Sequence, residues 1–129
     1  MELKRVVVTG LGALTPIGNT VPEYWDNLVN GVSGAGPITK FDATNFKTKF
    51  ACEVKNFNPE DFMDKKEARE LDPFVHYALA STAEAIKDAN LDFEKLDTDR
   101  IGVIWGSGIG GLKTSLDEVS NFAKSDAGP

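Results

Sequence analysis

The sequence predicts an α/β fold in which parallel, buried strands alternate with helices. Two observations support this prediction. β-Branched runs at residues 4–9 and 101–105 are typical of strands that are buried on both faces. Each run leads into a glycine-rich turn, at residues 10–19 and 106–111, and then into a helical pattern. Because two such strands cannot form a stable sheet, we expect the missing strands to come from residues beyond Pro129 or from another chain.

Composition and charge limit the classes of protein. The 129 residues, 41% hydrophobic and 26% charged, are ordinary for one globular unit spanning residues 1–129. The net charge of −6 argues against nucleic acid as a partner. No apolar run is long enough to span a bilayer or resembles a signal peptide, so we expect no membrane partner and a cytoplasmic location. One cysteine and one histidine allow neither an internal disulfide nor a zinc site, and no cofactor is expected.

The first glycine turn resembles a dinucleotide-binding loop only in part. A strand precedes Gly10 and Gly12, as in that loop. However, the third glycine would fall at Thr15, and Pro16 lies where the phosphate-binding helix should already have begun. A nucleotide-dependent oxidoreductase is therefore a disfavoured alternative, which a titration with NAD(P) would test.

The first helix has clear boundary signals. Thr20 and Glu23 fit a capping box, and Gly31 closes the helix. Trp25 lies on its apolar stripe together with Leu28, so we expect Trp25 in the core.

A longer helix begins at Asp72, which we expect to act as the capping residue, and runs to about Ala89. Alanines on several of its faces predict that this helix is buried. His76 has no visible partner for catalysis and is expected to be a packed residue. A last helix is predicted from Leu112 to about Lys124.

Residues 33–58 predict an irregular excursion that phenylalanines pin to the rest of the molecule. These anchors are Phe41, Phe46, Phe50 and Phe57. Cys52 has neither a base nor a helix N-terminus nearby, so we expect a half-buried hydrophobic residue and not a nucleophile. A short helix is predicted after the Asn58 cap.

The segment at residues 64–70 is dense in charge. Lys65, Lys66 and Arg69 form a local positive spot in an acidic protein, which could meet an acidic partner. Composition alone favours a solvated helix face instead. The residues by themselves leave both interpretations open.

Three motifs in order resemble the opening third of the β-ketoacyl-acyl-carrier-protein synthases, most of all the synthase II group of bacterial fatty-acid elongation. They are residues 5–19 (RVVVTGLGALTPIGN), 66–74 (KEARELDPF) and 106–111 (GSGIGG). Ile109, where synthase I usually has glycine, favours synthase II. The resemblance implies a thiolase-like, layered αβαβα fold and a homodimer. This chain would form the first part of the N-terminal half, and its end in turn-forming residues at 125–129 predicts a fragment that the remainder of the synthase chain completes.

The reaction implied by the resemblance is a decarboxylating Claisen condensation between acyl and malonyl groups on acyl carrier protein. A cysteine thiolate takes the acyl group, and two histidines assist decarboxylation. Cys52 and His76 match neither position in the family, so no catalytic residue is assigned among these 129.

Two sets of residues take a role from the resemblance. Gly108 and Ile109 fall at the wall of the acyl pocket, and Lys65, Lys66 and Arg69 fall where the family meets its carrier protein. This second assignment reverses the preference for a solvated face. Glu70 replaces a residue that is often basic, which would weaken the patch. A non-catalytic chain-length factor of a polyketide synthase stays open as the alternative.

Overall fold

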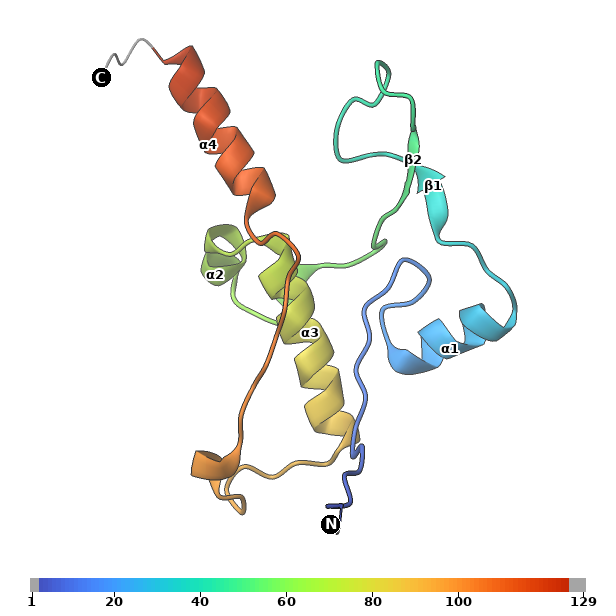
Figure 1. Ribbon diagram of the computed structural model, residues 1–129, viewed down its shortest axis with the longest axis vertical. Helices are drawn as coiled ribbons and strands as arrows, with labels where there is room; N and C mark the ends of the chain where they lie inside the picture. The colour runs from blue at the N-terminus through green and yellow to red at the C-terminus, as the bar shows by residue number, and fades with distance from the viewer. Residues whose placement is uncertain (1–2, 126–129) are drawn as a thin grey trace.

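The computed structural model describes residues 3–125. The longest helix, α3 (Pro73–Asp88), lies at the centre, with the other elements arranged around it (Figure 1). These are α1 (Val21–Val29), β1 (Ala35–Pro37), β2 (Phe50–Cys52), η1 (Pro59–Asp61), α2 (Lys65–Glu70), η2 (Thr98–Arg100) and α4 (Leu112–Lys124). The predicted helices are thus confirmed with nearly the predicted bounds. The turn predicted at the C-terminus lies mostly outside the described residues.

Backbone from the first glycine turn packs directly on α3. A Cβ atom added to Gly12 would lie 1.9 Å from the Ser81 carbonyl oxygen, and one added to Gly10 would lie 2.4 Å from that of Ala85. No side chain fits at either distance, so both positions require glycine because the two backbones approach so closely. The small side chains of α3 permit this approach.

Two carboxylates of α3 hold the same turn. The Leu11 amide donates to Oδ2 of Asp88, and the Ala13 amide donates to Oε2 of Glu84, each at 2.8 Å. The other oxygen of Glu84 accepts from the Val21 amide, also at 2.8 Å. Glu84 therefore joins the turn to the start of α1, and these charge-assisted bonds satisfy amides that have no strand partner.

Few residues in the described part of the chain are buried, and apart from Gly18 they lie on α3. His76 is 8% exposed and Ala80 is 5% exposed, and they are the only side chains among residues 3–125 that are buried. The prediction of a packed His76 is therefore confirmed, whereas most of α3 is only half-buried rather than buried as expected.

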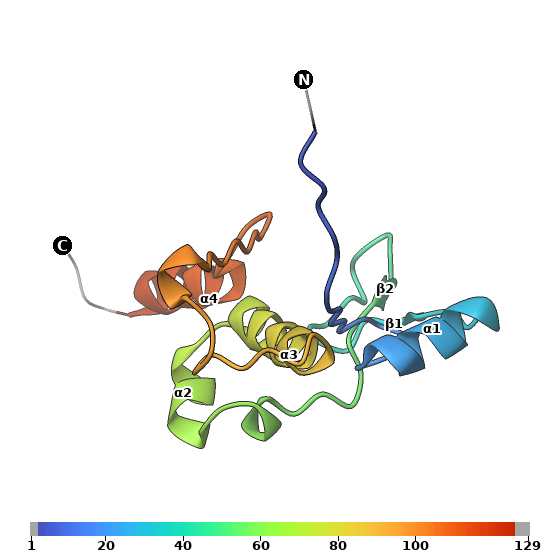
Figure 2. The ribbon, with the colours of Figure 1, turned by 90° about the horizontal axis from the view of Figure 1, so that it is seen from below.

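The two predicted central strands are extended but unpaired within residues 3–125. Figure 2 shows both on the same side of α3, and a groove of about 290 Å³ separates them. Its lining includes Thr9 and Trp105 from the two segments and Ser81 and Ala85 from α3. Val6 is 90% exposed and Ile104 is 99% exposed. The two segments form no sheet within residues 3–125, where no described segment supplies a neighbouring strand, and the partner strands were expected from residues beyond Pro129 or from another chain.

The excursion contains a strand pair that the sequence analysis missed. β1 and β2 are antiparallel, with Ala35 opposite Cys52, and they form the one sheet among the described residues. No sequence signal predicted them, because three residues per strand are too few to show an alternation of apolar and polar residues. Of the predicted anchors, Phe57 contacts α3, because its ring lies 5.5 Å from that of Tyr77. Phe41 and Phe46 contact each other and are more than half exposed.

The first helix is capped as predicted but does not bury its stripe. Thr20 Oγ1 accepts from the Glu23 amide at 3.3 Å, and Glu23 Oε2 accepts from the Asn19 amide at 2.6 Å. Gly31 follows with φ +68°. Trp25, predicted in the core, is 62% exposed, because nothing among the described residues covers this face of α1.

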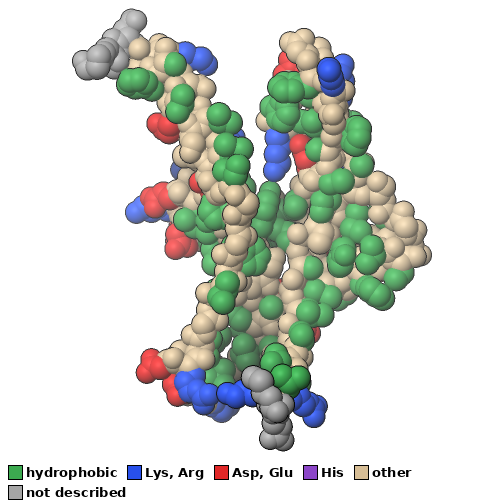
Figure 3. Space-filling model, in the orientation of Figure 1, with side chains coloured by type: hydrophobic (Ala, Val, Ile, Leu, Met, Phe, Trp, Pro, Cys, Tyr) green, Lys and Arg blue, Asp and Glu red, His purple; other side chains and the backbone are tan. Residues whose placement is uncertain are grey.

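Large apolar side chains also lie at the surface along α4 (Figure 3). They recur at helical spacing and are 50–66% exposed: Leu112, Leu116, Val119 and Phe122. Across residues 3–125 we find no helix whose length and hydrophobicity would let it cross a membrane.

Candidate functional site

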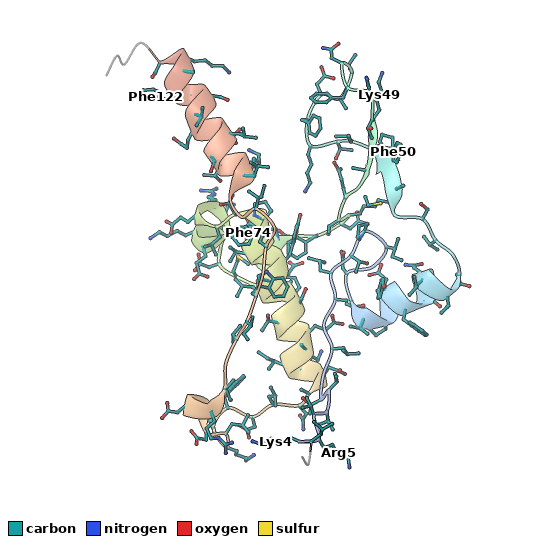
Figure 4. The ribbon with its side chains drawn as sticks, in the orientation of Figure 1. Lys4, Arg5, Lys49, Phe50, Phe74 and Phe122 are labelled. Atoms are coloured by element: carbon teal, nitrogen blue, oxygen red, sulfur yellow. The ribbon has the colours of Figure 1, made fainter. Side chains whose placement is uncertain are left out.

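The second glycine turn, residues 106–111, lies against the start of α3. A Cβ atom on Gly110 would lie 3.0 Å from the Phe74 ring, which Figure 4 places where this segment crosses α3. Gly111 precedes α4 with φ +68°, a left-handed conformation that favours glycine. The geometry of the turn is therefore set by α3 on one side and by α4 on the other.

The predicted acyl-pocket residues lie at the exposed side of this turn, which we call the gate turn. Ile109 is 72% exposed, and a Cβ atom on Gly108 would meet nothing within 4 Å. The turn thus offers an open backbone and one apolar side chain, and within residues 3–125 nothing lies over them.

Asp72 connects three elements at this place. Its backbone oxygen accepts from the Val75 amide at 2.9 Å, which begins α3. Its side chain makes no capping bond, contrary to expectation, because Oδ1 accepts from Thr114 Oγ1 in the first turn of α4 at 2.6 Å. The other oxygen, Oδ2, would lie 3.1 Å from a Cβ atom added to Gly111. Sequence analysis missed this contact because Thr114 lies 42 residues away with no local pattern to link the two.

A positive charge lies near the same carboxylate. The pKa of Lys113 is raised, chiefly by the hydrogen bond and charge of Asp117 and to a smaller extent by the charge of Asp72. Lys113 and Asp117 form an ion pair one helical turn apart on α4. The positive charge of Lys113 is thus paired with Asp117, and Asp72 contributes only a smaller part of its pKa shift.

Lys65, Lys66 and Arg69, the basic patch, lie on α2. Asp64 caps this helix by accepting from the Lys66 amide at 2.7 Å. All three basic side chains are exposed. Lys65 Nζ lies 4.0 Å from Glu60 Oε1, a weak surface pair. Within residues 3–125, Lys66 and Arg69 form no ion pair, so their charges are available to an acidic partner.

The basic patch and the gate turn are linked by Asp72, which follows α2 in the sequence and lies beside the gate turn. α2 ends where the Leu71 amide donates to the Glu67 carbonyl at 3.0 Å, and the next residue is Asp72. The structure therefore brings the two predicted site regions to the same end of α3.

The remaining candidates lie elsewhere. Cys52, expected to be half-buried, is exposed, because β2 pairs only with β1 in the described part. His76 Nε2 is buried and has no hydrogen-bond partner among the described residues. No group of three His, Cys, Asp or Glu side chains within residues 3–125 could hold a metal ion.

Comparison with known proteins covers nearly the whole chain. A profile of the β-ketoacyl synthase N-terminal domain matches residues 3–128. The 3-oxoacyl-[acyl-carrier-protein] synthase 2 of Synechocystis sp. is 52% identical over 129 residues, which are 100% of this chain and 30% of that protein. The enzyme of the same name from Staphylococcus aureus (strain COL) is 50% identical over 126 residues, 98% of this chain and 30% of the relative.

Two solved structures are similar as well. One is a type II polyketide synthase acyl-carrier protein in complex with its ketosynthase, AntDE:AntF. It has a TM-score of 0.75 and 29% identity, over 98% of this chain and 34% of that one. The other is the ishigamide ketosynthase/chain length factor, with a TM-score of 0.64 and 38% identity, over 70% of this chain and 22% of that one.

These similarities confirm the predicted fold class, a thiolase-like α/β fold of which the chain contributes part of the N-terminal region. The chain spans about 30% of the length of the curated relatives it matches. The motifs at residues 5–19, 66–74 and 106–111 all fall inside the matched range. The chain belongs to the β-ketoacyl synthase family, and its sequence corresponds to the N-terminal domain of that family.

Proposed function

We propose that this chain is the N-terminal part of a 3-oxoacyl-acyl-carrier-protein synthase 2 of fatty-acid biosynthesis. Identity of about 50% over the whole chain to two enzymes of that name is the observation that supports the proposal most strongly. The complete enzyme would be an acyltransferase that elongates an acyl group by decarboxylating condensation with malonyl carrier protein. We further propose a cytoplasmic homodimer.

In this proposal the 129 residues bind and orient substrate, while the bond-forming groups lie further along the synthase. Cys52 lies exposed on β2, away from a helix N-terminus that could stabilise a thiolate. His76 is buried within α3 and cannot reach a substrate without a rearrangement. We therefore expect residues 1–129 alone to be inactive in condensation.

The basic patch would bind the acyl carrier protein. Lys66 and Arg69 are exposed and form no ion pair within the described residues, so an acidic helix could approach them without displacing an internal partner. Such charges mainly raise the association rate, and salt screens their effect. One of the similar solved structures is a ketosynthase in complex with its acyl-carrier protein, which supports this class of partner.

The gate turn would form one wall of the acyl pocket. The glycine at position 108 lets an acyl chain pass close to the backbone, and the Ile109 side chain limits the room at its end. An apolar chain would also cover the exposed Ile109, which would favour binding through burial of apolar surface.

The direct test is a condensation assay of the full-length synthase with acyl and malonyl carrier protein, read by mass spectrometry of the product. We expect a product two carbons longer and release of carbon dioxide. Cys52→Ser serves as the internal control and should keep the wild-type rate. Loss of acylation by Cys52→Ser, or no condensation by the wild type, would contradict the proposal.

A chain-length factor is the second candidate, because the similar ishigamide structure is a ketosynthase/chain length factor. Such a protein would not condense carrier-bound substrates alone. It would instead restore product formation when mixed with a partner ketosynthase. The same assay, run with and without that partner, separates the two candidates.

A further inference from the structure

Asp72 is placed unlike an ordinary helix cap. Aspartate at this position normally accepts from the amides of the first helical turn. Here that bond is absent, and the carboxylate turns to α4 and accepts from Thr114 Oγ1 at 2.6 Å. A charge-assisted bond between segments 42 residues apart fixes their relative position more than a local cap would.

The same residue lies between the two regions to which we assign binding. The residue before it, Leu71, is the C-cap of α2, the helix that carries the basic patch. Its side chain contacts α4 and lies beside Gly111, the end of the gate turn. The ring of Phe74, two residues later, packs under Gly110. Asp72 therefore connects the end of α2 to the gate turn and to the first turn of α4.

We propose that Asp72 is a positioning residue, which through Thr114 locks the gate turn to the carrier-binding helix α2 and so sets the acyl-chain length accepted. This inference rests on the proposed function. In the wild type the lock holds Gly108 and Ile109 at one distance from α3. Without it, the first turn of α4 and the gate turn can move away from Phe74, and the pocket end widens.

The test uses the full-length synthase and the variants Thr114→Val and Asp72→Ala. We expect each to change the ratio of kcat/KM between long-chain and short-chain acyl substrates on carrier protein about tenfold. This follows from the loss of one hydrogen bond to a carboxylate, about 1.5 kcal/mol, at 1.4 kcal/mol per tenfold. The KM for malonyl carrier protein should stay within about twofold, because the basic patch keeps its charges.

A double variant and a rescue separate positioning from general damage. The double variant Asp72→Ala and Thr114→Val should change the kcat/KM ratio no more than either single variant does, because both substitutions remove the same hydrogen bond. Asp72→Asn keeps an oxygen acceptor for Thr114 and should keep the wild-type profile. Amide hydrogen exchange at residues 106–111 should rise in Asp72→Ala and not in Asp72→Asn, a readout independent of activity.

Thr39→Val is the matched control. Thr39 Oγ1 donates to Glu53 Oε2 at the same 2.6 Å, but it lies beside the β1–β2 pair, away from the gate turn. It should leave the chain-length profile unchanged. If the wild type condenses and the Asp72 and Thr114 variants keep its profile, or if Thr39→Val shifts it equally, the inference is wrong and the proposed function stands. If the wild type does not condense, both are wrong.

Discussion

The two long helices of this chain differ in what covers them. α3 has small side chains where it meets the first glycine turn, and the backbone of that turn packs directly on it. α4 has large apolar side chains at the same helical spacing, and all of them are at least half exposed. The periodicity of a helix therefore predicts which face is apolar, but not whether anything in the same stretch of chain lies against it.

The difference divides the residues into two groups with different expected effects. Residues that join α3 to the glycine turns should affect stability. Residues on the open side, at the basic patch and the gate turn, should affect activity at constant stability. Substitutions in the full-length synthase can separate the two groups.

Gly12→Val should destabilise the protein most. Its Cβ would lie 1.9 Å from the Ser81 carbonyl oxygen, so the backbone of the turn or of α3 must shift. We expect the free energy of unfolding to fall by about 3 kcal/mol, measured by urea denaturation. Gly36→Ala is the matched control, since an added Cβ meets nothing within 4 Å there. An equal loss in both variants would contradict close packing on α3.

Glu84→Ala should destabilise by about 2 kcal/mol, because the amides of Ala13 and Val21 lose their acceptor. Glu118→Ala removes a carboxylate from an exposed position of α4 and should change the same urea midpoint little. The prediction fails if the two variants unfold at one urea concentration.

Charge reversal at Lys66 and Arg69 should act on binding alone. We expect the double variant Lys66→Glu and Arg69→Glu to raise KM for carrier-linked substrate about tenfold at low salt, with kcat kept. Raising the salt concentration should reduce the difference, because screening weakens the wild-type attraction. Reversal of Lys49, exposed in the excursion, is the control. A KM that does not move would remove the basic patch from carrier binding.

Ile109→Phe should change which acyl chains are accepted, because Ile109 is the one large apolar side chain of the gate turn. The larger ring would shorten the acyl chains that fit. Product lengths, measured by mass spectrometry, should shift to shorter chains. An unchanged length distribution would show that Ile109 does not limit the pocket.

Sequence alone predicted the parts of the fold that depend on local chemistry. The capping by Thr20 and the start of α3 at Pro73 follow from neighbouring residues, and both are confirmed. The prediction that Trp25 is buried was wrong, because burial depends on residues that are distant along the chain or outside it. The short β1–β2 pair was missed because three residues show no periodicity.

The candidate site was predictable in part for a similar reason. The motifs located the basic patch and the gate turn, but only the structure showed that both lie near the N-terminal end of α3. The contact of Asp72 with Thr114 had no local signal, and the usual preference of aspartate for a capping role pointed elsewhere. The roles of these residues in binding stay predictions.

In the complete synthase, we expect other parts of the protein to cover the open faces and to pair with the extended segments. Amide hydrogen exchange of the full-length protein at residues 4–8 and 101–105 would report this pairing. We predict slow exchange at both segments, comparable to that of α3, because each would be paired in a sheet over the groove. Exchange within seconds at both segments, with α3 protected, would show that the segments stay unpaired in the complete protein.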